Sequence, residues 1–101
     1  MGVVKDNPDA SRYELFVDGE VAGFAEYRLH DGRIELLHTE VEAGHEGAGL
    51  GSRLARAVLD DARDRGLPIV PRCEFMAGYI ARHADDYLEL VVPEMRDQLS
   101  A

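Results

Sequence analysis

Residues 46–53 read Glu-Gly-Ala-Gly-Leu-Gly-Ser-Arg, and this glycine-rich run separates a strand-like first half of the chain from a mostly helical second half. A strand that leads through glycines into a helix presents unpaired backbone N–H groups at the helix start, where the helix dipole also favours negative charge. Because glycine has no Cβ, a pyrophosphate can approach such a backbone closely. The run therefore predicts a phosphate-bearing ligand held by the main chain from Gly47 to Ser52.

Strand patterns joined by tight turns precede the glycines. Residues 12–17, 21–29 and 33–41 are rich in apolar and aromatic residues, and an Asp-Gly pair separates each of them from the next. Turns this short join antiparallel neighbours. We therefore expect a three-stranded antiparallel meander over residues 12–41.

The second half combines helices with short strands. From Gly49 onward apolar residues recur at helical spacing, and Gly66 and Pro68 end the pattern. Residues 69–70 predict a short buried strand parallel to residues 33–41. The remaining patterns predict a helix over residues 74–83 with Phe75, Tyr79, Ile80 and His83 toward the core, an edge strand over 88–92 and a terminal helix over 93–99.

Size and composition are those of one globular domain. The chain has 101 residues, which predicts a single domain over residues 1–101. Apolar residues make up 46% and charged residues 31%, and no apolar run approaches the ~20 residues that span a bilayer. The N-terminus lacks the apolar region of a signal peptide, and the single cysteine fits a reducing compartment. We therefore expect a cytoplasmic protein that does not bind membranes.

The net charge of −9 limits the expected partners. Nucleic-acid binding needs cationic surface, so we expect no nucleic-acid partner. An acidic surface favours a basic partner such as an amine, although acidic surfaces also serve solubility. No spacing of His, Cys and Asp resembles a zinc or iron site, so we expect no bound metal.

The glycine spacing excludes two common phosphate-binding loops. A P-loop needs Lys followed by Ser or Thr after its second glycine, and the chain has no such Lys. The Rossmann fingerprint G-x-G-x-x-G fails because the glycines run G-x-G-x-G and follow a meander. Spacing alone leaves another interpretation open, a connector whose small residues let the helix pack closely on the sheet.

Three segments together resemble the GNAT superfamily of acyl-CoA N-acyltransferases, and more narrowly its small stand-alone GNAT-like domains. They are the run from His38 through Arg53, the segment Gly66-Leu-Pro-Ile-Val-Pro, and Cys73-x-Phe. The family's pyrophosphate loop, Arg/Gln-x-x-Gly-x-Gly/Ala, falls on Glu46-x-x-Gly49-x-Gly51. The resemblance covers residues from about 12 to 92. Glu46 departs from it, since a carboxylate cannot donate a hydrogen bond to a phosphate.

The resemblance implies a fold that combines helices and strands, α/β in the broad sense and α+β more narrowly. Its sheet would be mixed and mostly antiparallel, with a CoA-binding helix after the glycines and a second helix after Cys73. Larger members carry a pair of helices after the first strand, for which the Asp18-Gly19 turn leaves no room.

The resemblance also implies acetyl-CoA as cosubstrate and direct attack by an amine on its thioester carbonyl. The acceptor would be an amine-bearing small molecule, or a lysine or N-terminus of a protein. Acyl-CoA would lie where residues 33–41 separate from the strand after the helix, and backbone N–H groups around Val41 would polarise its carbonyl. Glu40 flanks this point and could attract a cationic amine, or it could be an ordinary solvated side chain.

Two side chains are candidates for the proton transfers. His38 precedes the proposed carbonyl site, and an imidazole titrates near pH ~6.5, which suits a base or an acid at neutral pH. Cys73 begins the second helix, where the dipole favours a thiolate, and it could protonate the leaving thiolate or accept the acyl group. The alternative for each is purely structural: a histidine packed against the sheet and a small buried thiol.

The coenzyme-binding residues follow from the loop and from the resemblance, which also places Tyr79 beside the pantetheine arm. They are Glu40, Val41, Gly47, Ala48, Gly49, Leu50, Gly51, Ser52, Arg53 and Tyr79. We therefore expect an acetyl-CoA-dependent N-acetyltransferase. A non-catalytic module that senses or carries acyl-CoA and a structural protein without a nucleotide are the alternatives.

Overall fold

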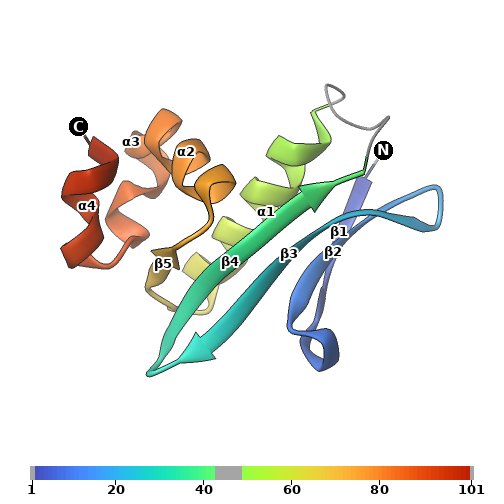
Figure 1. Ribbon diagram of the computed structural model, residues 1–101, viewed down its shortest axis with the longest axis horizontal. Coiled ribbons are helices and arrows are strands. Elements are labelled where there is room, and N and C mark those ends of the chain that lie inside the picture. Colours follow the sequence, from blue (N-terminus) through green and yellow to red (C-terminus); the bar gives the residue numbers. More distant parts are fainter. Residues whose placement is uncertain (1, 43–48, 101) are drawn as a thin grey trace.

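A five-stranded sheet forms the first layer of the fold (Figure 1). The computed structural model describes residues 2–42 and 49–100. The strands follow the order of the sequence, and all neighbours are antiparallel except the parallel pair β4 and β5. They are β1 (Gly2–Asn7), β2 (Arg12–Val17), β3 (Glu20–His30), β4 (Arg33–Val41) and β5 (Ile69–Pro71).

The predicted meander and the parallel strand are both confirmed, and with them the mixed, mostly antiparallel sheet. The sequence analysis missed β1. Its six residues hold only one pair of adjacent valines and then turn polar, so they carry no clear alternation. Pairing with β2 along its whole length stabilises this edge strand instead.

Helices supply the second layer. The main ones are α1 (Leu50–Asp64), α2 (Glu74–Arg82), α3 (Ala84–Tyr87) and α4 (Pro93–Ser100), and short 3-10 turns lie at Pro8–Ala10 and Leu88–Leu90. Figure 1 shows α1 against the sheet and the other three helices beyond the β5 end. The predicted edge strand over residues 88–92 is wrong. Residues 88–90 continue the helical path of α3, and Val91 alone bridges to Ile69.

The end of α1 follows from one glycine. Gly66 has φ +68°, a conformation that costs glycine little. The amide of Gly66 donates to the carbonyl of Arg63, and the amide of Leu67 donates to that of Ala62, which together form a Schellman motif. The chain then turns directly into β5, so the predicted stop at Gly66 is confirmed.

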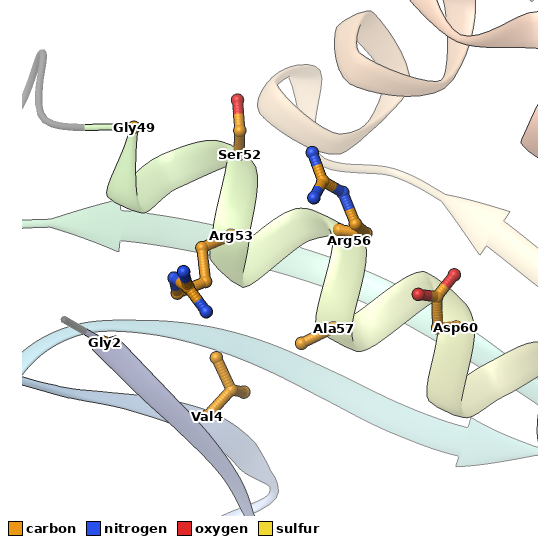
Figure 2. Close-up of a pocket in the computed structure, with 8 residues that line it drawn as sticks. All are labelled: Gly2, Val4, Gly49, Ser52, Arg53, Arg56, Ala57 and Asp60. Atoms are coloured by element: carbon orange, nitrogen blue, oxygen red, sulfur yellow. The ribbon is translucent and has the colours of Figure 1, made fainter.

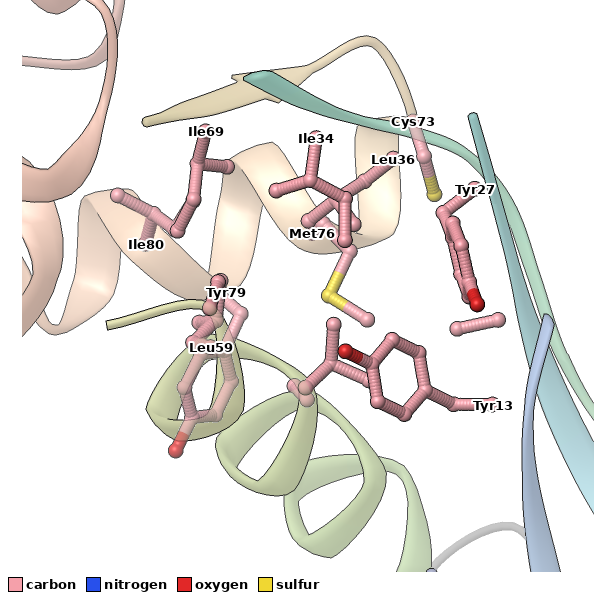
Figure 3. Packing of buried hydrophobic residues seen from close by; sticks show 14 of the residues in the cluster. Tyr13, Tyr27, Ile34, Leu36, Leu59, Ile69, Cys73, Met76, Tyr79 and Ile80 are labelled. Atoms are coloured by element: carbon pink, nitrogen blue, oxygen red, sulfur yellow. The ribbon is translucent and has the colours of Figure 1, made fainter. Parts of the chain in front are cut away.

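The core lies between α1, α2 and one face of the sheet. Met76, Tyr79 and Ile80 share the buried face of α2 at the spacing of a helix, and Figure 3 shows them beside Ile34 and Leu36. Phe75, predicted to face the core, is 37% exposed because it lies one position off this face. His83 is half-buried and stacks on the Tyr79 ring at a centroid distance of 4.1 Å.

The opposite face of the sheet carries no helix from the β2–β3 connection. Asp18 and Gly19 both adopt positive φ, +52° and +82°, so β2 and β3 join in a two-residue turn. This turn follows the second strand, because β1 precedes the strand that the sequence analysis took as the first. The first strand is followed by the 3-10 turn Pro8–Ala10, so the sequence analysis placed the missing helix pair at the wrong connection. Phe24 lies on this open face with the guanidinium of Arg12 over its ring at 4.6 Å.

Two buried tyrosines donate hydrogen bonds to aspartates, one on the last turn of α1 and one on the edge strand β1. Tyr13 donates a hydrogen bond to Asp61 of α1 at 2.5 Å, and Tyr27 donates to Asp6 of β1 at 2.6 Å. Arg65 lies within 4 Å of both aspartates. Burial and then the hydrogen bond to a carboxylate raise the pKa of Tyr27 to about 12, and the same causes raise the pKa of Tyr13 further.

These tyrosines predict a loss of stability in alkali. A pKa raised in the folded state stabilises the fold below the ordinary pKa of ~10 and loses that contribution as the pH rises toward the folded value. We expect the melting temperature to fall steeply between pH 10 and 12. The double variant Tyr13→Phe/Tyr27→Phe should be less stable at pH 7, by about 1–3 kcal/mol, with a flatter alkaline slope. Thermal unfolding followed by circular dichroism measures both, and parallel slopes would contradict the prediction.

Candidate functional site

The start of α1 is built on Gly49, the N-cap residue, at φ +75° and ψ 8°. Its carbonyl accepts the first helical bond from the amide of Arg53 at 3.1 Å. Gly51 lies in the first turn, where a Cβ would come within 3.0 Å of the Phe75 ring. Of the other predicted loop residues, Gly47 and Ala48 lie outside the described residues, as does Glu46.

Strands β4 and β5 separate close to this helix start. Their parallel pairing ends at Leu36 and Pro71. The amides of Arg72 and Cys73 then both donate to the carbonyl of Leu36 at 3.0 Å, and the chain turns into α2. Strand β4 continues to Val41 beside β3 alone, so its last residues face an opening between the strands.

A β-bulge at Leu37 changes which residues of β4 face that opening. Tyr27 pairs with Leu36 and Glu26 with His38, so Leu37 has no partner on β3. Beyond the bulge the amide of Glu42 points to β3, where it donates to Ala22 at 2.7 Å. Because amide direction alternates along a strand, the amides of Thr39 and Val41 point away from β3 toward the opening.

The two predicted catalytic side chains lie on opposite faces of β4. His38 is on the open face, 53% exposed, with its ring 6.0 Å from that of Phe24 and its Nε2 3.3 Å from Glu40 Oε1. Cys73 is only 8% exposed and lies on the helix face, where its Sγ donates to Thr39 Oγ1 at 3.4 Å. The structure thus separates the imidazole from the thiol by the thickness of the sheet, close to the same point of β4.

A cationic pocket borders the outer side of α1 (Figure 2). Its volume is about 400 Å³. The residues that line it are Gly2, Val4, Gly49, Ser52, Arg53, Arg56, Ala57 and Asp60. The sequence analysis predicted three of them as ligand contacts, namely Gly49, Ser52 and Arg53.

Arg56 was missed as a candidate, although its spacing of four residues from Ser52 places both on one side of α1. A hydrogen bond with the Tyr79 side chain is the main cause that raises the pKa of Arg56. Tyr79 itself is 2% exposed, so its side chain belongs to the core.

A buried carboxylate on β4 is a second feature that the sequence analysis did not find. Glu35 is 5% exposed, and burial by itself would raise its pKa. Hydrogen bonds from Arg28 at 2.6 Å and Arg72 at 3.2 Å outweigh burial, so the pKa of Glu35 is lowered. The trio joins β3, β4 and the end of β5 and holds the sheet together beside the point where it opens.

A comparison with models of protein families shows which family this chain belongs to. The model of the family described as GCN5-related N-acetyl-transferase matches residues 12–90. The chain belongs to this family. The match includes β4, the start of α1 and Cys73, which are the elements around the opening.

Individual relatives agree with the family. Streptothricin acetyltransferase of Streptomyces lavendulae is 43% identical over 51 residues, which are 48% of this chain but only 27% of that protein. The solution structure of a GCN5-like candidate N-acetyltransferase from Staphylococcus aureus has a TM-score of 0.65 at 24% identity. That likeness covers 89% of this chain and 87% of the other, and it shows a shared fold.

The described residues provide neither a metal cluster nor a membrane span. Within residues 2–42 and 49–100, no three His, Cys, Asp or Glu side chains gather where they could hold a metal ion. In the same residues, no helix is long and apolar enough to cross a membrane.

The conformation of Gly49 predicts the effect of a side chain there. An L-residue in the left-handed region costs about 1–2 kcal/mol, although a Cβ at Gly49 would meet no atom within 4 Å. We expect Gly49→Ala to lower the free energy of unfolding by that amount. Gly78→Ala in α2 is the matched control, and it should raise stability by about 0.5–1 kcal/mol because alanine favours a helix interior. Urea unfolding compares the two, and equal effects would contradict the role of backbone strain.

Proposed function

We propose that this chain binds acetyl-CoA and transfers its acetyl group to an amine. The observation that carries the proposal is the opening between β4 and β5, which lies beside the first turn of α1. A Cβ on Gly51 would lie 3.9 Å from Val41 Cγ2, so the end of β4 and the helix start are neighbours. One extended coenzyme could therefore contact both with its acyl end and its phosphates.

In this proposal the pyrophosphate binds to the backbone of Gly47–Ser52. The helix start of α1 favours an anion, and no acidic residue lies in its first turn. The hydroxyl of Ser52 and the guanidinium of Arg53 add donors beside it. Glu46 offers no donor, so the affinity depends on main-chain groups.

The acyl carbonyl would face the amides of Thr39 and Val41. Hydrogen-bond donors that are already aimed at a developing oxyanion stabilise the tetrahedral intermediate without reorganisation. The amine nitrogen attacks the carbonyl carbon, the C–S bond breaks, and coenzyme A leaves as the thiolate.

The two faces of β4 would then serve two proton transfers. His38 takes the proton of the incoming amine on the open face, where Glu40 favours a cationic acceptor. Cys73 gives its proton to the departing thiolate on the helix face, and solvent restores it. This division supports direct attack within a ternary complex over an acyl-cysteine, since the thiol is buried away from the acceptor's side.

The decisive experiment measures binding and turnover separately. Calorimetry with acetyl-CoA tests binding, and thiol release across a panel of amines tests transfer. The panel should include a polyamine, a lysine peptide and streptothricin, because the streptothricin acetyltransferase is 43% identical to this chain over 51 residues. Binding together with acceptor-dependent thiol release supports the proposal. Binding without thiol release would favour a module that senses or carries acyl-CoA.

The proposed binding of the pyrophosphate at the first turn of α1 can be tested with a variant of Gly51. Gly51→Val places a side chain against the flexible Phe75 ring, which can move, so we expect a folded protein. Its branched side chain would still crowd the backbone that the phosphates approach, and we expect acetyl-CoA affinity to fall about tenfold or more. Unchanged affinity in calorimetry would remove the first turn of α1 from the binding site.

Variants of the two proton-transfer residues should affect turnover rather than acetyl-CoA affinity. His38→Gln and Cys73→Ala should lower turnover about a hundredfold, within the range of general acid–base effects, and leave acetyl-CoA affinity within twofold. His30→Gln is the matched control, because His30 is the last residue of β3, at the opposite end of the β3–β4 pair from the opening. If either His38→Gln or Cys73→Ala keeps the wild-type turnover, that residue has no part in the chemistry.

A further inference from the structure

The pocket on the outer side of α1 extends beyond the residues that the proposed pyrophosphate site uses. Its volume of about 400 Å³ is typical of small-molecule sites. Figure 2 shows Ser52 and Arg56 on one side of the helix, while Arg53 is turned toward Gly2 and β1. The lining therefore includes two arginines, whose side chains extend to different sides of α1, in a chain whose net charge is −9.

Arg56 is held in place by the core beneath it. Its guanidinium interacts with the side chain of Tyr79, a buried residue whose ring is stacked on that of His83. A hydroxyl can occupy one N–H group of a guanidinium and leave the remaining donors for a ligand.

Asp60 is the acidic member of the pocket lining, and its charge is engaged elsewhere. Its Oδ1 accepts a hydrogen bond from the Tyr87 hydroxyl at 2.9 Å and lies 3.3 Å from Arg63. Both partners lie outside the pocket lining. The carboxylate is therefore partly balanced by groups that a ligand would not displace.

We propose that Arg56, assisted by Ser52, binds the ribose 3′-phosphate of the coenzyme. The inference rests on the proposed function, because the pyrophosphate at the first turn of α1 fixes where the nucleotide begins. Arg56 lies four residues along the helix from Ser52, about 6 Å along its axis. One ribose ring separates the 3′-phosphate from the pyrophosphate, so a ligand anchored at Ser52 reaches Arg56.

A phosphate monoester is the anion that suits this site. It carries a charge of about −1.5 to −2 at neutral pH and accepts paired hydrogen bonds from a planar guanidinium. The pocket thereby distinguishes coenzyme A from dephospho-coenzyme A, which lacks this phosphate. Tyr79 is a positioning residue in this arrangement, since it acts through Arg56.

The test compares the two coenzymes by calorimetry. Wild-type protein should bind coenzyme A at least tenfold more tightly than dephospho-coenzyme A. Arg56→Gln should remove most of that preference by weakening coenzyme A alone, with dephospho-coenzyme A affinity within twofold of wild type. Tyr79→Phe keeps the ring and should reduce the preference in the same direction. Arg82→Gln, at an exposed residue outside the pocket, makes the same change in net charge and should keep the full preference.

Each result of this comparison either supports or overturns the proposed 3′-phosphate site. Equal binding of both coenzymes by the wild type overturns this site while leaving the proposed function intact. Equal weakening of both by Arg56→Gln also overturns it, because the arginine would then act on another part of the molecule. Loss of the preference in Arg82→Gln would reduce the effect to net charge and overturn it as well. If the wild type binds neither coenzyme, the proposed function fails and this inference fails with it.

Discussion

The end of the β4–β5 ladder at Leu36 is the constraint on which the rest of the site depends. Pro71, opposite Leu36, has no amide, and the next two amides both use the Leu36 carbonyl. No backbone amide of residues 71–73 is then left to pair with β4 beyond Leu36, and the chain enters α2 instead. The opening is therefore made by local hydrogen bonding, and it does not require a strained sheet. Because α2 starts there, Cys73 is brought against Thr39 at the same position.

The bulge at Leu37 gives that opening its chemistry. Without it, the alternation set by Ile34 and Leu36 would continue, and different amides would face the gap. The extra residue directs the amides of Thr39 and Val41 into the opening and turns the His38 side chain to the open face. A single inserted residue thus decides which groups meet a ligand from each side. The buried trio of Glu35 with Arg28 and Arg72 stabilises the sheet just before this irregular point.

Sequence reasoning succeeded where one local signal decides the structure. The Asp-Gly turns gave the meander, Gly66 the end of α1, and a short apolar run flanked by prolines the parallel strand. Sequence reasoning failed where tertiary contacts determine the local structure. Strand β1 exists because β2 offers an edge, and residues 88–90 form a 3-10 turn although the composition of residues 88–92 suits a strand. At the site, proximity of Cys73 to the end of β4 was predictable from topology, but the faces that His38 and Thr39 occupy depend on a bulge at Leu37 that has no sequence signature.

The open face of the sheet connects the fold to the choice of acceptor. The β2–β3 turn of two residues leaves Phe24, His38 and Glu40 uncovered by any helix from that connection. An acceptor approaching His38 therefore meets a broad surface with an aromatic ring and a carboxylate beside the imidazole. Such a surface can contact the parts of a large acceptor that surround its amine, whereas it offers a small amine few enclosing contacts. In the proposed mechanism the coenzyme lies on the helix side of the sheet, so the specificity for the coenzyme and for the acceptor would belong to separate layers of the molecule.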